Sequence, residues 1–212
     1  MKLNSIDLFC GCGGLSEGMH QAGFKTKVAV EIEEKAVLAY KLNHKRTIVI
    51  QKDIRKVDID KVKKHFKGEP VHLLAGCPPC QGFSSVRRLN RPQSIEDDRN
   101  DLVLEYLRFV KELKPLTIMM ENVPALQHYD KFKYVVDELR KLGYNPKVRI
   151  VNVKDYEVPQ SRKRLVMVGS ILGNLEIANP INKKVTVRDM IGNIESTETT
   201  HDLVHKIYPK HT

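Results

Sequence analysis

Long apolar runs are absent from this sequence of 212 residues. No run approaches the ~20 consecutive apolar residues that a membrane-spanning helix needs, which excludes a membrane protein. The first residues, MKLNSIDLF, carry no n-region, h-region or cleavage site of a secretory signal, so we expect a cytoplasmic protein. Hydrophobic residues (41%) and charged residues (29%) occur at ordinary levels, which excludes a disordered chain.

Cysteines are also few: Cys10, Cys12, Cys77 and Cys80 form two close pairs. A disulfide framework is not expected in a chain of this size without an export signal. The C-x-C and C-x-x-C spacings leave a zinc or redox site open as an alternative. The glycines and polar residues that flank the two pairs have no role in a zinc knuckle, so we predict no metal.

Acidic residues are outnumbered, with 26 Asp and Glu against 36 Lys and Arg, a net charge of +10 and a pI near 9.4. Such an excess is typical of proteins that bind polyanions. A lysine-rich surface that only keeps the protein in solution is an alternative that charge alone does not exclude.

Short apolar runs alternate with amphipathic helical stretches, and the last two runs have no helix between them. Helical spacing of apolar residues is clearest in residues 102–113 and 132–142. This order predicts an α/β fold with a doubly wound, mostly parallel, Rossmann-like sheet and an antiparallel end. The predicted strands are residues 5–9, 28–32, 48–50, 71–75, 116–120, 148–153 and 165–168.

Polar or glycine-rich groups follow each of the first five predicted strands, where such sheets bind their ligands. The turn in residues 7–14, DLFCGCGG, lacks the Gly-Lys-Ser/Thr of a P-loop, and Ser16 stands where a dinucleotide fingerprint needs glycine. Glu31 suits two ribose hydroxyls and Asp53 suits an exocyclic amine. These features predict an adenosine-bearing cofactor without a pyrophosphate; a tight structural turn with solvent-facing acids is the alternative.

The segment GCPPCQGFS, residues 76–84, places a cysteine on a loop that two prolines stiffen. Cys80 is therefore a candidate nucleophile at the ligand edge of the sheet. Positive charge from Arg87, Arg88 or Arg162 would raise its thiolate fraction.

Four motifs in order, DLFCGCGGLSEGM, GCPPCQGFS, ENV at 121–123 and QSRKR at 160–164, closely resemble the cytosine-C5 DNA methyltransferases over about residues 3–170. The resemblance implies the S-adenosylmethionine-dependent methyltransferase fold, S-adenosylmethionine as methyl donor and a cytosine of DNA as acceptor. A cytosine-C5 methyltransferase of RNA (tRNA) and a non-catalytic module that binds nucleic acid are the alternatives.

The resemblance also implies catalytic roles. Cys80 would add to C6 of the cytosine, and Glu121 would hydrogen-bond N3 and supply a proton. Arg162 would bind O2, while Arg164 would support its loop. The base that removes the C5 proton is not identified by the sequence.

For the cofactor, the resemblance implies contacts from the glycine turn, from the two acids and from two isoleucines that would sandwich the adenine. Ile32 stands where the family often has an aromatic residue, and Cys77 where it often has glycine. The predicted cofactor residues are Phe9, Cys10, Gly11, Cys12, Gly13, Gly14, Glu31, Ile32, Asp53, Ile54, Pro79 and Leu102.

Residues 84–100 have few apolar side chains and carry Arg87, Arg88 and Arg91, and a loop of this length in a compact domain is uncommon unless it is functional. It resembles the family's mobile catalytic loop, which closes over DNA from which the base has been flipped out. An ordinary solvated loop is the alternative. The predicted nucleic-acid contacts are Gln81, Ser84, Arg87, Arg88 and Arg91.

The regular pattern fades after about residue 172. We therefore predict a cofactor-binding and catalytic domain at 1–172 and, at 173–212, a tail that leads toward the family's target-recognition domain. No such domain is evident in the sequence. We expect either a truncated form or one half of a split enzyme whose second polypeptide supplies recognition of DNA.

Overall fold

The computed structural model describes residues 3–79, 101–181 and 183–201 of the chain. It divides into two compact units, Met1–Val151 with Lys163–Ala178, and Asn152–Arg162 with Asn179–Thr212. The functional division at residue 172 stays a prediction. Within the described ranges, no helix has the length and apolar character that crossing a bilayer requires.

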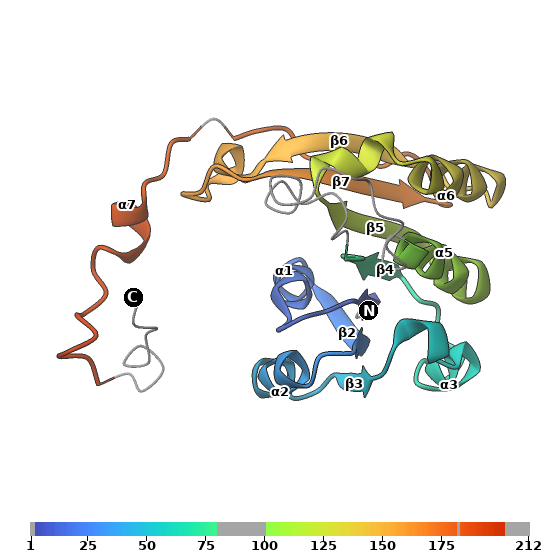
Figure 1. Cartoon of the computed structure of the whole chain (residues 1–212), viewed down its shortest axis with the longest axis horizontal. Coiled ribbons are helices and arrows are strands. Elements are labelled where there is room, and N and C mark those ends of the chain that lie inside the picture. Colours follow the sequence, from blue (N-terminus) through green and yellow to red (C-terminus); the bar gives the residue numbers. More distant parts are fainter. Residues whose placement is uncertain (1–2, 80–100, 182, 202–212) are drawn as a thin grey trace, which may run out of the picture. The chain divides into compact units, whose positions relative to one another are not determined.

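The first unit is built on a seven-stranded sheet with the order β3-β2-β1-β4-β5-β7-β6 (Figure 1). Neighbouring strands from β3 to β5 are parallel, and β7 pairs antiparallel with β5. The doubly wound sheet with an antiparallel end is therefore confirmed. The strands are β1 (Leu3–Leu8), β2 (Phe24–Glu31), β3 (Ile48–Gln51), β4 (Leu73–Gly76), β5 (Thr117–Asn122), β6 (Lys147–Asn152) and β7 (Lys163–Ser170).

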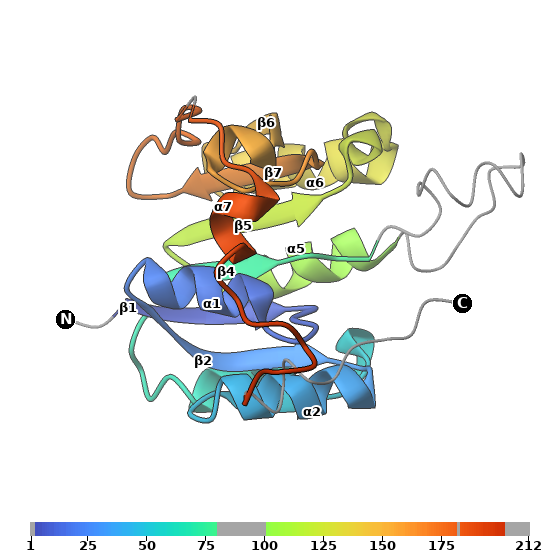
Figure 2. The same cartoon turned by 90° about the vertical axis from the view of Figure 1, so that its left-hand side faces the viewer.

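Helices cover both faces of this sheet, with α1 and α2 on one face and α3, α5 and α6 on the other (Figure 1). Figure 2 looks onto the face that α1 and α2 cover. The helices are α1 (Gly14–Gln21), α2 (Glu34–Asn43), α3 (Ile59–Lys64), α5 (Leu102–Leu113) and α6 (Asp130–Lys141), with short 3-10 turns η1 (Ile54–Lys56) and η4 (Pro124–His128).

Alternate residues of the central strands enter two apolar clusters on opposite faces of the sheet. Val28 and Val30 belong to the larger cluster, which also contains Tyr106 and Phe109 of α5. Ala29, between the two valines, belongs to a smaller cluster on the other face. Side chains alternate across a strand in this way, and burial of both faces explains why β2 is apolar at every position from residue 28 to 30.

Strand β2 begins at Phe24, four residues earlier than predicted. Most of its first residues are polar. They nevertheless pair in parallel with the start of β1, where Ser5 aligns with Thr26. The two hydroxyls lie 3.1 Å apart in the core, and the hydrogen bond between them replaces the apolar contact that the prediction relied on.

The second unit contains η5 (Val153–Tyr156) and the short helix α7 (Val187–Ile191). A reciprocal pair of hydrogen bonds between Thr186 and Asp189 caps the start of α7. Asp155 accepts a backbone hydrogen bond from Ile181 at 2.9 Å, which connects the two segments of this unit.

Candidate active site at the carboxyl edge of the sheet

The glycine turn after β1 reverses the chain at the carboxyl edge of the sheet. Phe9 has φ +60°, Gly11 has +52° and Gly13 has +99°. A non-glycine residue with positive φ is uncommon, and such strained positions cluster at functional sites. Hydrogen bonds from Cys10 N to Val30 O (3.1 Å) and from Gly13 N to Cys10 O (2.9 Å) hold the turn against β2.

Gly13 has no room for a side chain. A Cβ atom built there would lie 2.4 Å from two ring atoms of His44 and 3.0 Å from Tyr40. His44 lies this close because its Nε2 is 3.0 Å from the carbonyl oxygen of Gly13. Asn43 adds a hydrogen bond to Cys12 O at 3.4 Å, so the end of α2 supports the turn from behind.

Glu31, the last residue of β2, is joined to the glycine turn. Its Oε2 accepts a hydrogen bond from Gly11 N (2.9 Å), and its Oε1 accepts from Ile32 N (2.8 Å) and Glu33 N (2.9 Å). A carboxylate has about four acceptor positions, two on each oxygen. These three bonds orient the group and leave acceptor capacity on Oε2, which suits a hydroxyl of a ligand.

Asp53, after β3, has a partner that the sequence analysis missed. Its carboxylate accepts hydrogen bonds from the Arg55 side chain, including one of 2.6 Å from a terminal nitrogen, and from the Arg55 backbone at 3.0 Å. These bonds hold the pKa of Asp53 below its usual range, so it is ionised at neutral pH. A ligand amine would share the carboxylate with Arg55.

The two isoleucines predicted to sandwich an adenine differ in exposure. Ile32 is 62% exposed at this edge, whereas Ile54 is only 4% exposed and belongs to the large apolar cluster. Ile54 is further fixed by its carbonyl, which accepts from Arg108 at 2.7 Å. The sandwich stays a prediction, with Ile32 as the side chain that offers open surface.

The segment after β4 is fastened to both of its neighbouring strands. Cys77 N donates to Leu8 O at 3.2 Å, and the buried side chain of Asn122 donates to Pro78 O at 2.8 Å. Asn122 also accepts from Val123 N at 2.8 Å. The ENV motif therefore positions the start of the cysteine loop through its asparagine, a role the sequence analysis did not assign.

Two of the cysteines are poor nucleophiles. Burial raises the pKa of the Cys10 and Cys77 thiols well above the usual range, and the Glu121 carboxylate, which Cys77 hydrogen-bonds, raises that of Cys77 further. The structure thus leaves neither of them as a thiolate at neutral pH. The remaining members of the predicted loop, Cys80, Gln81, Ser84, Arg87, Arg88 and Arg91, lie outside the described residues.

Glu121 of β5 forms an ion pair with Arg164 of β7, with Arg164 Nε 2.7 Å from Glu121 Oε1. The side chains are 27% and 19% exposed, so the pair is largely withdrawn from solvent. Loop support by Arg164 stays a prediction; the structure adds that Arg164 pairs with Glu121, the predicted proton donor. Arg162 belongs to the second unit, where its backbone N–H donates to Asn152 Oδ1 at 3.0 Å.

The other predicted cofactor residues occupy varied surroundings. Cys12 and Gly14 are exposed at the turn, Pro79 is half-buried, and Leu102 is buried at the start of α5. In the part of the chain that the structure describes, Cys10, Cys12 and Cys77 are free thiols. No group of three or more His, Cys, Asp or Glu side chains in that part is arranged to hold a metal ion.

Behind the glycine turn lies a buried polar chain. Asp7, fully buried in β1, accepts a hydrogen bond from Ser16 at 2.6 Å, and Ser16 lies 2.6 Å from the Tyr40 hydroxyl. The other oxygen of Asp7 has no hydrogen-bond partner among the described residues. Burial raises the pKa of Asp7 to about 7. An aspartate between the apolar Ile6 and Leu8 of β1 was the sequence signal for this group.

Comparisons with known proteins give a consistent result. A sequence model described as C-5 cytosine-specific DNA methylase matches residues 3–211. The chain is 36% identical to Type II methyltransferase M1.HphI of Haemophilus parahaemolyticus, over 91% of this chain and 53% of that protein. It is 35% identical to Type II methyltransferase M.XorII of Xanthomonas oryzae pv. oryzae, over 97% of this chain and 49% of that protein. The chain thus spans about half the length of these relatives.

Solved structures with a similar fold are also methyltransferases. A prophage-encoded E. coli protein described as a DNA modification methyltransferase superposes with a TM-score of 0.74 at 32% identity, over 89% of this chain and 54% of that one. The Entamoeba histolytica methyltransferase EhMeth superposes with a TM-score of 0.72 at 24% identity, over 88% of this chain and 58% of that one, which supports the fold alone.

Proposed function

Because the chain belongs to the C-5 cytosine-specific DNA methylase family, we propose that it transfers a methyl group from S-adenosylmethionine to C5 of cytosine in DNA. The observation that carries the proposal is the ion pair of Glu121 and Arg164 at the same sheet edge as the glycine turn. The pair orients a carboxyl group at the edge where the glycine turn lets a ligand approach the backbone, which supports the proposal.

The proposed chemistry begins with Cys80, because C5 of cytosine is too weak a nucleophile to take a methyl group unaided. The Cys80 thiolate adds to C6 while Glu121, which takes up a proton as the base binds, gives that proton to N3, so the ring becomes an enamine that is nucleophilic at C5. After methylation at C5, a base removes the C5 proton. Cys80 then leaves C6 with its electron pair, the C5–C6 double bond is restored, and N3 returns its proton to Glu121.

Arg164 is proposed as a positioning residue for Glu121. A guanidinium that binds one carboxylate oxygen fixes the rotamer of the acid and so the direction in which it meets N3. Arg162, which precedes β7, is proposed to bind O2 of the same base. The sequence places both arginines in the QSRKR motif, two residues apart.

The cofactor residues fit S-adenosylmethionine in their chemistry. The oriented Glu31 carboxylate keeps acceptor capacity for a ribose hydroxyl, and the glycines of the turn allow close approach of a ligand to the backbone. Asp53 is the proposed acceptor for the adenine amine. When bound, S-adenosylmethionine supplies the methyl group.

DNA is the proposed macromolecular partner. The net charge of +10 and the presence of Arg87, Arg88 and Arg91 support phosphate contacts, whose strength should fall steeply with salt. Base-specific contacts are proposed to come from a recognition segment or second polypeptide beyond these residues, because the chain spans about half of M1.HphI and M.XorII. M1.HphI and M.XorII are Type II methyltransferases, which supports a role in restriction and modification.

The test is covalent trapping on DNA that contains 5-fluorocytosine, in the presence of S-adenosylmethionine. Fluorine at C5 cannot leave as a proton does, so the Cys80–C6 bond should persist and appear as an adduct by mass spectrometry. We expect the adduct to disappear in Cys80→Ala and to persist in the matched control Cys77→Ala. An adduct that survives Cys80→Ala would contradict the assignment of the nucleophile. No adduct on any variant, when the proposed recognition polypeptide is supplied, would contradict the activity.

A further inference from the structure

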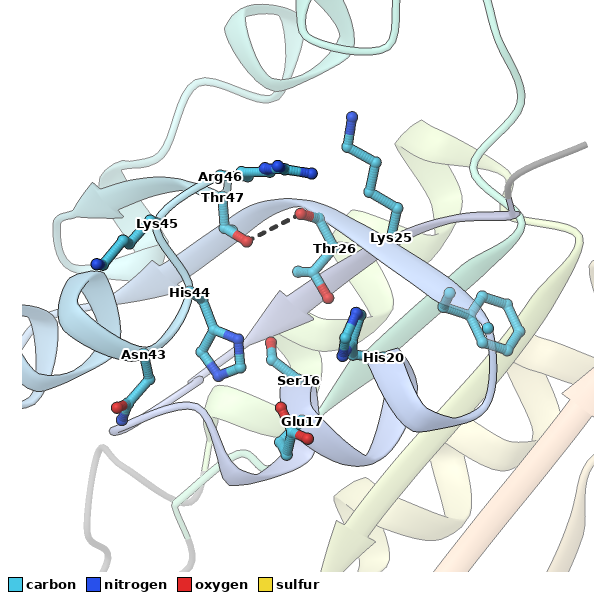
Figure 3. A pocket seen from close by; sticks show the side chains of 12 residues that line it. Ser16, Glu17, His20, Lys25, Thr26, Asn43, His44, Lys45, Arg46 and Thr47 are labelled. Atoms are coloured by element: carbon cyan, nitrogen blue, oxygen red, sulfur yellow. Dashed lines mark hydrogen bonds between the residues drawn. The ribbon is translucent and has the colours of Figure 1, made fainter.

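A pocket of about 510 Å³ lies on the α1–α2 face of the first unit (Figure 3). Its walls are one side of α1, the first residues of β2 and the segment that connects α2 to β3. Its volume falls within the range of small-molecule sites, roughly 300–1,000 Å³.

Positive charge dominates the lining. Lys25, Lys45 and Arg46 line the pocket together with two histidines, against the single carboxylate of Glu17. Arg46 extends across the pocket toward Lys25, whereas Lys45 points away from both (Figure 3). In the described ranges, neither Lys25 nor Arg46 is among the cations that form an ion pair with a carboxylate. Two unpaired cations that converge on one concavity favour an anionic ligand.

Two hydroxyls of the pocket have their hydrogens engaged elsewhere. Thr47 donates to the Thr26 carbonyl at 3.0 Å, and Ser16 donates to Asp7 at 2.6 Å. The charged donors for a ligand are the cationic side chains Lys25 and Arg46. The fork of an arginine side chain matches two oxygens of a phosphate, and a lysine adds a mobile point charge.

The pocket is separate from the proposed cofactor site. Lys25 lies at the amino end of β2, six residues before Glu31 at the carboxyl end. At about 3.3 Å per residue in a strand, the two are roughly 20 Å apart. A ligand held by Lys25 and Arg46 is thus not the group that Glu31 and Asp53 would bind.

We propose that this pocket is a second ligand site, which binds a small phosphorylated molecule through Arg46 and Lys25. A concave pocket with cations at its mouth suits a compact phosphomonoester, whereas a continuous nucleic-acid backbone requires an extended row of cations. The site does not depend on the methyl-transfer proposal, because Arg46 and Lys25 have no role in the machinery proposed above.

The test is titration of the isotopically labelled chain with inorganic phosphate and, separately, with adenosine 5′-monophosphate, followed by amide chemical shifts. We expect the largest shifts in residues 43–47 and 24–26. Arg46→Gln should weaken binding of both probes by about tenfold or more, which is the loss of one charge-assisted pair at about 1.4 kcal/mol per factor of ten. Lys41→Gln, an exposed lysine of α2 outside the pocket, is the matched control and should leave binding unchanged.

Three results would overturn the proposal. If Lys41→Gln weakened binding of the probes as much as Arg46→Gln does, the anions would be held by the general positive charge of the surface and not by a site. Shifts confined to the carboxyl edge, around residues 31 and 53, would place the anion in the cofactor site. A short DNA duplex whose binding falls in Arg46→Gln, without any response to adenosine 5′-monophosphate, would assign the pocket to the DNA backbone. Since Arg46 and Lys25 are exposed, the variants should fold, and circular dichroism checks this.

Discussion

Arg164 Nε lies 2.7 Å from Glu121 Oε1. The two residues are 43 positions apart in the chain, and their ion pair joins two neighbouring antiparallel strands. Exposed ion pairs contribute little, typically about 0–1 kcal/mol. This one is largely withdrawn from solvent and holds a single acid in place, so its value lies in orientation. The relationship connects the ENV and QSRKR motifs, which the sequence presents as separate.

We expect Arg164→Gln to lower the methyl-transfer rate by about 10- to 100-fold, with a smaller effect on KM. The loss should stay below the roughly 10²–10⁴ that a general acid contributes, because Glu121 itself remains. Single-turnover rates measure the effect. Arg140→Gln, which removes an exposed ion pair with Asp137 on α6, is the control and should change nothing. A rate for Arg164→Gln equal to the native rate would remove Arg164 from the mechanism.

Glu31→Gln should weaken binding of S-adenosylmethionine by about tenfold or more. The amide loses the negative charge that orients three backbone N–H donors, and its NH₂ group cannot accept from Gly11. Isothermal titration calorimetry gives the comparison, with Glu33→Gln as a neighbouring exposed control. Equal heats for the native chain and Glu31→Gln would show that the ligand does not use this acid.

Gly13→Ala should destabilise the fold by about 1–3 kcal/mol, since φ +99° is unfavourable for alanine and its Cβ would meet His44 at 2.4 Å. Denaturant unfolding measures the change. In the double variant with His44→Ala, the destabilisation caused by the clash should disappear. The destabilisation caused by the unfavourable φ should remain. Gly18→Ala, in the middle of α1 with nothing within 4 Å, should instead be neutral or stabilising.

The elements with clear periodicity could be predicted from the sequence. The stripe of α5 from Leu102 is buried as expected, and the parallel sheet and the family are confirmed. Two kinds of feature could not be predicted. The start of β2 is hidden because Ser5 and Thr26 satisfy each other in the core. Contacts between residues far apart in the sequence, such as Glu121 with Arg164, leave no local pattern in the sequence.

The candidate site also contains features that could be predicted from the sequence and features that could not. Gly11 and Glu31 were predicted as members of one edge, and they are joined by a hydrogen bond of 2.9 Å. Arg55 was missed because a partner two residues from Asp53 depends on the local 3-10 turn and not on any motif. The pocket around Lys25 and Arg46 was missed for a further reason, since its residues come from three elements and share no periodicity.

The buried carboxyl of Asp7 predicts an unusual dependence of stability on pH. Its pKa is raised from 3.8 to about 7 in the folded chain, chiefly by burial. Between about pH 4 and pH 7 the folded state therefore keeps a proton that the unfolded state has lost. Stability contributed by this group is complete below about pH 4, falls as the pH rises through that window and is constant above it, with a total loss of about 4 kcal/mol at about 1.4 kcal/mol per pKa unit.

Asp7→Asn should remove this loss, because an amide stays neutral and can still accept the hydrogen bond from Ser16. The measurement is urea unfolding at several pH values between 4 and 8, with the native chain, Asp7→Asn and the exposed control Asp137→Asn. The difference in unfolding free energy between Asp7→Asn and the native chain should grow toward pH 7, whereas Asp137→Asn should follow the native curve. A difference that does not vary with pH would mean that Asp7 is ionised in the folded state throughout, held by partners other than Ser16.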